Sequence, residues 1–174
     1  MRLRPAVPDD APALLANVVA GFEGYRAFAP PGWIPPQEDT PARLAELREM
    51  LVNPGAFARV AEVDGVFAGH VLVEPGARAS PDGVMPDLHV RHLFVPEPFW
   101  GTGVARELHG AAVDWMHGLV RLFTPTGQAR ARRFYEREGW TLHGQPWFVM
   151  AMQLSLVEYR RVTSYGEPKD ETRM

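Results

Sequence analysis

The sequence predicts one domain of mixed α/β class from its length, its element order and a hairpin. The chain has 174 residues, of which 46% are hydrophobic, and this length and composition suit a single domain with one core. Strand and helix patterns alternate between residues 88 and 138, and such alternation requires a parallel strand pair. Asp64-Gly65 lies between two apolar runs, which is the strongest short signal for an antiparallel hairpin. Both kinds of pairing are therefore expected in one sheet.

The first half is expected to form a strand, two helices and a hairpin. Asp9 and Asp10 are suitable N-cap residues, and apolar residues three and four apart follow them, as in a half-buried helix. The proline-rich stretch 25–36 excludes regular helix and central strand, and Thr40 with Pro41 starts the second helix. The expected ranges are a strand at 2–7, helices at about 9–22 and 41–51, and hairpin strands at 59–63 and 66–73.

The second half is expected to alternate strands with helices and to close with a strand pair. A polar loop at 74–86 precedes it, and Gly139 ends its last helix. The expected ranges are strands at 88–95 and 120–123, helices from about 104 and at 129–138, and strands at 140–143 and 148–157. The whole order is β-α-α-β-β-β-α-β-α-β-β, in one domain over residues 1–163 with a polar tail at 164–174.

Composition excludes several kinds of function. A net charge of −3 and a pI of about 6.1 argue against a nucleic-acid binder, which needs a basic surplus. Without cysteine the chain has no disulfide, thiolate metal site or cysteine nucleophile. Its few serines lie outside any G-x-S-x-G elbow. No apolar run resembles a signal peptide or a membrane span, so we expect a cytoplasmic protein with no membrane partner.

A glycine turn between a strand and a helix is the first chemical signal. Gly101 and Gly103 lie in the segment 95–105, where backbone N–H groups and the helix N-terminus together suit a pyrophosphate. A tight turn with no ligand is the alternative for two glycines alone. A dinucleotide fingerprint would need glycine where Arg106 stands, and a Gly-Lys-Ser/Thr P-loop is absent.

Two segments of the sequence resemble motifs of the GNAT (Gcn5-related N-acetyltransferase) superfamily. Residues 95–105 (VPEPFWGTGVA) resemble its motif A, with Trp100 where the family has arginine or glutamine. Residues 128–140 (QARARRFYEREGW) resemble its motif B, with Gln128 in place of the usual asparagine and Trp140 in place of phenylalanine. The order and spacing of the two motifs also agree, so the resemblance implies the acyl-CoA N-acyltransferase fold.

The resemblance implies acetyl-CoA, or another acyl-CoA, as the donor of an acyl group. Backbone amides of the glycine turn would bind the pyrophosphate, and the preceding strand would pair with the pantetheine arm like an added strand. The residues so implied are Leu93, Phe94, Val95, Trp100, Gly101, Thr102, Gly103, Val104, Ala105 and Gln128. No metal is expected, because His89 and His92 have metal-ligand spacing but would point to opposite faces of a strand.

The resemblance also assigns the proton transfers. An amine with a pKa of about 10.4 must lose a proton to attack, and His89 stands where many relatives carry a carboxylate, with Asp87 in reserve. A strand histidine satisfied by a neighbour is an equal alternative. Tyr135 occupies the position of the tyrosine that protonates the leaving thiolate; the alternative is a core aromatic. With no cysteine, direct transfer in a ternary complex is favoured.

The acceptor is the least defined part of the prediction. Aromatic residues before the second helix would line an apolar pocket for it, or would only pack this segment onto the sheet; they are Phe22, Tyr25, Phe28 and Trp33. An N-acetyltransferase for a small-molecule or protein amine is the leading function, and a noncatalytic acyl-CoA-binding module is the alternative. Residues 148–157 would serve either a homodimer interface or a buried strand.

Overall fold

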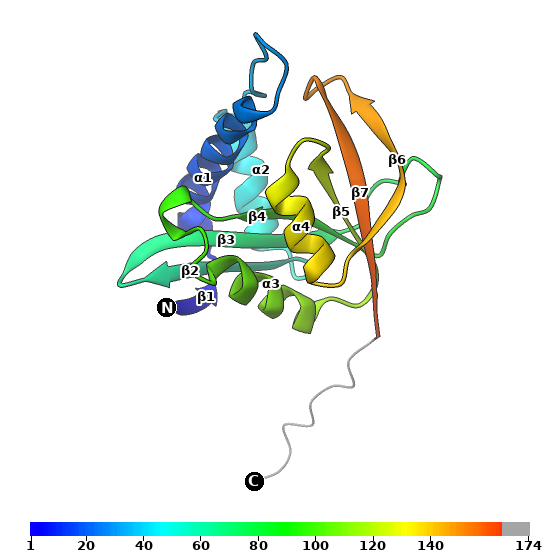
Figure 1. Ribbon diagram of the computed structural model, residues 1–174. Helices are drawn as coiled ribbons and strands as arrows, with labels where there is room; N and C mark the ends of the chain where they lie inside the picture. Colours follow the sequence, from blue (N-terminus) through cyan, green and yellow to red (C-terminus); the bar gives the residue numbers. More distant parts are fainter. Residues whose placement is uncertain (165–174) are drawn as a thin grey trace.

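A computed structural model of the chain describes residues 1–164 as a seven-stranded mixed sheet with helices on both faces (Figure 1). The strands are β1 (Arg2–Pro5), β2 (Phe57–Val63), β3 (Val66–Pro75), β4 (Leu88–Phe94), β5 (Gly118–Pro125), β6 (Thr141–Val149) and β7 (Leu154–Thr163). The helices are α1 (Ala11–Glu23), α2 (Pro41–Leu51), α3 (Val104–Trp115) and α4 (Ala129–Arg137), with short 3-10 turns at Pro8–Asp10, Gly24–Ala27 and Glu97–Phe99. The polar tail predicted for 164–174 lies, except for Ser164, outside the described residues.

The element order and the mixed sheet confirm the predicted fold class. The strand order is β1-β2-β3-β4-β5-β7-β6. Strands β4 and β5 pair in parallel across α3, and every other neighbouring pair within residues 1–164 is antiparallel. Asp64 and Gly65 both have positive φ and connect β2 to β3 by the two-residue turn that their sequence predicts.

Two hydrophobic layers hold the sheet between its helices. On one face α3 and α4 bury Val104, Leu108, Ala112 and Tyr135 against the centre of the sheet. On the other face α1 and α2 bury Leu14 and Leu47 against Val60 and Leu72. In Figure 1, β5 is drawn beside α4, with β7 and β6 beyond it, and α1 and α2 lie together over the half of the sheet made by β1 to β4. Within residues 1–164 no helix is long and apolar enough to cross a membrane.

The last two strands differ from the ranges that the sequence predicts. Strand β6 runs through the glycine and proline at 144 and 146, and its pairing with β7 is irregular between His143 and Trp147. Strand β7 continues to Thr163 and lies between β5 and β6, so its Leu156 and Val157 are buried. Phe148 on the edge strand β6 is 54% exposed, and a homodimer through it stays a prediction.

A β-bulge in β4 positions the site described below. Leu72 of β3 pairs with His92, whereas the next residue of β3, Val73, pairs with Val90, so Arg91 is one extra residue in β4. A bulge kinks a strand and interrupts its alternation of faces. The parallel ladder between β4 and β5 joins Leu88–Val90 to Val120–Leu122, and residues of β4 beyond the bulge do not pair with β5. The two strands therefore part at the bulge.

Candidate active site

The glycine turn forms an open cradle at the N-terminus of α3. Gly101 and Gly103 have φ values of 77° and 92°, which side chains rarely adopt. A Cβ atom added at either glycine would meet no atom within 4 Å. The first helical hydrogen bond runs from Glu107 N–H to Gly103 O at 3.1 Å, so the amides of Gly103, Val104 and Ala105 precede the helical ladder. These amides and the open space before them fit a phosphate group.

Some of the predicted donor-binding groups already have partners in the protein. The backbone N–H of Trp100 donates to Glu97 O at 3.0 Å, and that of Thr102 donates to Phe99 O at 3.4 Å. The carbonyl of Val95 accepts a hydrogen bond from the indole of Trp100 at 2.7 Å. The backbone N–H of Gln128, the N-cap residue of α4, donates to Pro125 O at 2.9 Å. The cradle therefore relies on Gly103, Val104 and Ala105 more than on the residues before them.

Arg130 brings a cation to the edge of this cradle. Its Cζ atom lies 3.1 Å from the centre of the Trp100 ring, which is cation–π stacking. The sequence shows four arginines on α4 but not which of them reaches the turn. The structure identifies Arg130 and places its charge beside the position where Trp100 replaces the arginine or glutamine of the motif.

Tyr135 is buried on α4, with its ring against Trp140 at 6.0 Å and Tyr159 at 6.1 Å between centroids. Its hydroxyl makes no hydrogen bond to any residue from 1 to 164. Burial raises the pKa of Tyr135 above its ordinary value, and Tyr25 raises it further through its electrostatic effect. The phenol therefore keeps its proton at neutral pH and is available as a donor.

His89 lies on the opposite face of the sheet from α3, with its ring centroid 5.2 Å from that of Phe123. Its Nδ1 atom is buried without a hydrogen-bond partner in the described chain. Burial, followed by the charge of Arg121, lowers the pKa of His89 to about 3, so the imidazole is neutral at pH 7 but weakly basic. Asp87, the reserve base, instead accepts a hydrogen bond from Leu119 N–H at 2.7 Å and supports the start of β5.

The four predicted acceptor-pocket aromatics come together after α1. Tyr25 lies 5.4 Å from both Phe22 and Phe28, measured between ring centroids. Trp33 donates its indole N–H to Met152 O at 2.7 Å, which attaches the segment to the β6–β7 turn. Tyr25 and Trp33 are buried, so these two residues at least pack the segment, as the alternative interpretation holds. Phe22 also meets Phe94 of β4, with ring centroids 6.0 Å apart.

A buried polar chain that the sequence did not predict lies under α1. Asn17 Nδ2 lies 3.0 Å from His70 Nδ1, and His70 Nε2 lies 3.3 Å from His92 Nδ1. The bulge at Arg91 turns His92 toward α1 and α2, the face that His89 also points to, so the prediction of opposite faces was wrong. Within residues 1–164 no three acidic, histidine or cysteine side chains form a metal-binding group. A lone asparagine inside the apolar helix α1 was the available signal.

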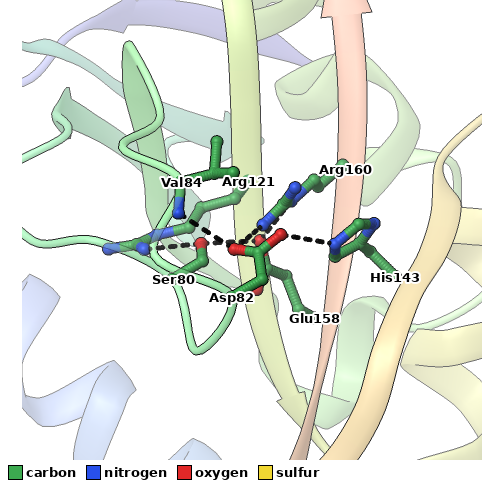
Figure 2. Close-up of polar contacts among 7 residues, drawn as sticks. All are labelled: Ser80, Asp82, Val84, Arg121, His143, Glu158 and Arg160. Atoms are coloured by element: carbon green, nitrogen blue, oxygen red, sulfur yellow. Dashed lines mark hydrogen bonds and ion pairs between the residues drawn. The ribbon is translucent and has the colours of Figure 1, made fainter.

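A second polar network fastens the β3–β4 loop to the sheet on the same face. Figure 2 shows it among Ser80, Asp82, Val84, Arg121, His143, Glu158 and Arg160. Glu158 is 2% exposed, and its Oε1 accepts hydrogen bonds from Ser80 Oγ at 2.8 Å and Arg160 Nε at 2.6 Å. Arg160 also reaches Asp82 at 2.8 Å and lowers the pKa of that carboxyl. Charged hydrogen bonds therefore hold the loop beside His89.

The two parallel strands that part after Val90 and the open glycine cradle before α3 agree with the fold that the resemblance implies, and the comparisons identify the family. Residues 22–140 match the acetyltransferase (GNAT) family. The match covers more than half of the chain, so the protein belongs to this family and is an acetyltransferase of GNAT type. No curated protein sequence matches the chain.

Solved structures of acetyltransferases share the fold. A GCN5-related N-acetyltransferase from Rhodopseudomonas palustris superposes with a TM-score of 0.67 at 19% identity, over 93% of this chain and 95% of that chain. The Salmonella typhimurium protein yncA, solved with its cofactor acetyl-CoA, gives 0.66 at 19% identity, over 98% of both chains. A ribosomal-protein-alanine N-acetyltransferase from Brucella melitensis gives 0.65 at 20% identity, over 94% of this chain and 100% of that chain.

Proposed function

We propose that the protein transfers an acetyl group from acetyl-CoA to a primary amine, of a small molecule or of a protein, by direct transfer in one ternary complex. Residues 1–163 would act as a single domain in this reaction. The parting of β4 from β5 after Val90, beside the open cradle of Gly101 and Gly103, is the observation that carries the proposal.

The donor would lie along β4 and the glycine turn. Amides of Gly103, Val104 and Ala105 would bind the pyrophosphate, where the α3 dipole also favours an anion. Arg130 would add a positive charge there, since it already lies over Trp100. Leu93 and Phe94, in the part of β4 that has left β5, and Val95 after them would pair with the pantetheine amides as an added strand does.

The acyl transfer needs one proton acceptor and one proton donor. The bound thioester supplies the acyl group, whose carbonyl carbon the neutral amine attacks as the carbon–sulfur bond breaks. His89, with its unpartnered Nδ1, would take the proton that the nitrogen loses once it bonds to the carbonyl carbon and becomes far more acidic. Tyr135 would give its proton to the leaving sulfur, because its raised pKa keeps it protonated.

Calorimetric titration with acetyl-CoA, desulfo-CoA and ATP tests the donor site. We expect micromolar binding of acetyl-CoA and desulfo-CoA and no comparable binding of ATP. Gly103→Trp should weaken acetyl-CoA binding at least about tenfold, a loss of about 1.4 kcal/mol, because it fills the cradle. Gly110→Trp is the control: Gly110 lies within α3, whose N-cap residue is Gly103, and a Cβ there also meets no atom within 4 Å.

The outcomes separate the proposal from its alternatives. Acetyl-CoA binding with thiol release on addition of amines supports the enzyme. Binding without thiol release from any amine would favour the noncatalytic acyl-CoA module. Unchanged affinity in Gly103→Trp would remove the pyrophosphate assignment.

A further inference from the structure

The buried chain Asn17–His70–His92 joins the end of β4 to the space under α1 and α2. His70 is 0% exposed and Asn17 is 7% exposed. The rings of His70 and His92 meet edge to face, with centroids 5.3 Å apart. Burial lowers the pKa of His70 to about 3 and that of His92 well below its ordinary value. Both rings are therefore neutral at pH 7, and each carries one proton on one of its two nitrogens.

One backbone carbonyl decides which nitrogens carry those protons. Asn17 Nδ2 lies 3.0 Å from Phe94 O, and a carbonyl only accepts, so the amide NH₂ group must point there. Its second hydrogen then faces His70 Nδ1 at 3.0 Å, which must accept. His70 consequently carries its proton on Nε2 and donates it to His92 Nδ1 at 3.3 Å. His92 is left with its proton on Nε2.

His92 Nε2 has no hydrogen-bond partner in the described chain, and its ring lines a small cavity between α1, α2 and β4. The cavity has a volume of about 20 Å³, room for about one water-sized group, and its apolar wall is Leu15, Val18, Leu47 and Met50. Its charged residues already pair: Arg43 lies 3.2 Å from Glu38, and Arg91 lies 2.9 Å from Glu46. The imidazole N–H is therefore a polar group of this lining that has no partner in the described chain.

We infer that His92 is a substrate-binding residue that donates its Nε2–H to one carbonyl or carboxylate oxygen of the acceptor amine, with Asn17 and His70 as positioning residues. Only this oxygen would enter the cavity, which has room for one water-sized group. That the bound molecule is the acceptor amine rests on the proposed function. Because the cavity offers a donor, it suits amino-acid-like amines and amino amides. A diamine would place a second ammonium, itself only a donor, against this N–H.

Nitrogen-15 NMR of the six histidines at pH 7 reads the tautomers directly, with His92→Gln to assign the His92 signals. We expect His92 and His70 to be protonated on Nε2. Asn17→Asp replaces the amide donor by an acceptor, so it should reverse the chain and move the His92 proton to Nδ1. Asn53→Asp is the matched control, because Asn53 uses its Oδ1 as an acceptor for Gly55 N–H and Asp can do the same. A His92 proton on Nδ1 in the wild type, or no change in Asn17→Asp, would overturn the inference.

Two small probes that share a carbon skeleton and differ in their charged group test which class of ligand binds to His92. Titration with 3-methylbutanoate should shift the His92 Nε2–H resonance, whereas 3-methylbutylammonium should leave it unchanged. Carboxylate binding should weaken at least tenfold in Asn17→Asp and persist in Asn53→Asp. A response to the ammonium but not to the carboxylate would overturn the assignment. These readouts need no acetyl-CoA, so they fail or succeed independently of the titration that tests the proposed function.

Discussion

Tyr135→Phe removes one oxygen atom and should lower the rate of catalysis while leaving the free energy of unfolding nearly unchanged. The Tyr135 hydroxyl has no hydrogen-bond partner among residues 1–164, so its loss leaves no buried group unpaired and should change the free energy of unfolding by less than about 1 kcal/mol. A lost proton donor typically lowers the rate by about 10² to 10⁴, which corresponds to roughly 2.7–5.4 kcal/mol in the activation free energy. Affinity for acetyl-CoA should not change, since the backbone cradle is untouched.

Tyr159→Phe is the matched control, and it should show the opposite pattern. The Tyr159 hydroxyl donates to Glu136 at 2.6 Å and accepts from Arg132 at 3.2 Å. Hydrogen bonds to charged groups contribute about 1.5–3 kcal/mol, so this variant should lose that much stability while keeping most of its turnover.

The assay pairs two measurements on each protein. Thiol release at saturating acetyl-CoA, with an amine that the wild type acetylates, gives kcat and KM, and urea unfolding gives the free energy. A Tyr135→Phe enzyme that keeps at least a third of the wild-type kcat would refute the proton-donor role. Equal losses of rate in the two variants would point to the packing of α4 instead.

Two further outcomes concern stability. Glu158→Ala removes the carboxylate at the centre of the network in Figure 2 and should lower the free energy of unfolding in urea by about 3–5 kcal/mol. The control Glu107→Ala, at an exposed residue, should stay within about 0.5 kcal/mol of the wild type. A loss below about 1 kcal/mol in Glu158→Ala would contradict the role of the network. Because the pKa of His70 is about 3 in the folded protein and about 6.5 when unfolded, only the unfolded chain takes up this proton as pH falls below 6.5. His70 alone should therefore lower stability by about 2 kcal/mol at pH 5, and equal unfolding free energies at pH 7 and pH 5 would be inconsistent with this.

Local patterns predicted most of the fold because each element carries its own signal. Asp64-Gly65 specified a hairpin, and Thr40-Pro41 started α2, where Thr40 Oγ1 accepts from Arg43 N–H at 3.2 Å. The end of the sheet was less predictable. The glycine and proline at 144 and 146 are turn signals, yet β6 continues through them with an irregular register that long-range pairing with β7 imposes.

The part of the candidate site that is made of backbone amides was predictable from the sequence. The side-chain contacts of the site were less predictable. Two glycines with a fixed spacing identified the cradle, because a positive φ and an open front need a residue without Cβ. The indole contact of Trp100 with Val95 depends on how a loop folds back, which no pattern indicates. His92 was predicted to point to the face opposite His89 because the alternation of a regular strand does not reveal an extra residue.

The extra residue Arg91 changes which residue numbers of β4 point toward α3. Before Arg91 the odd-numbered side chain His89 points away from α3, and after Arg91 the even-numbered His92 points the same way, while Leu93 joins the α3 core. Deletion of Arg91 would remove the bulge and leave these faces unchanged, because Val90, His92 and Leu93 would then alternate as in a regular strand. His92 would still face the cavity under α1 and Leu93 the α3 core, but the strand would regain the straightness needed to stay beside β5. The gap between β4 and β5 would therefore close although no side chain of β4 had changed its face, so the bulge is needed for the opening itself.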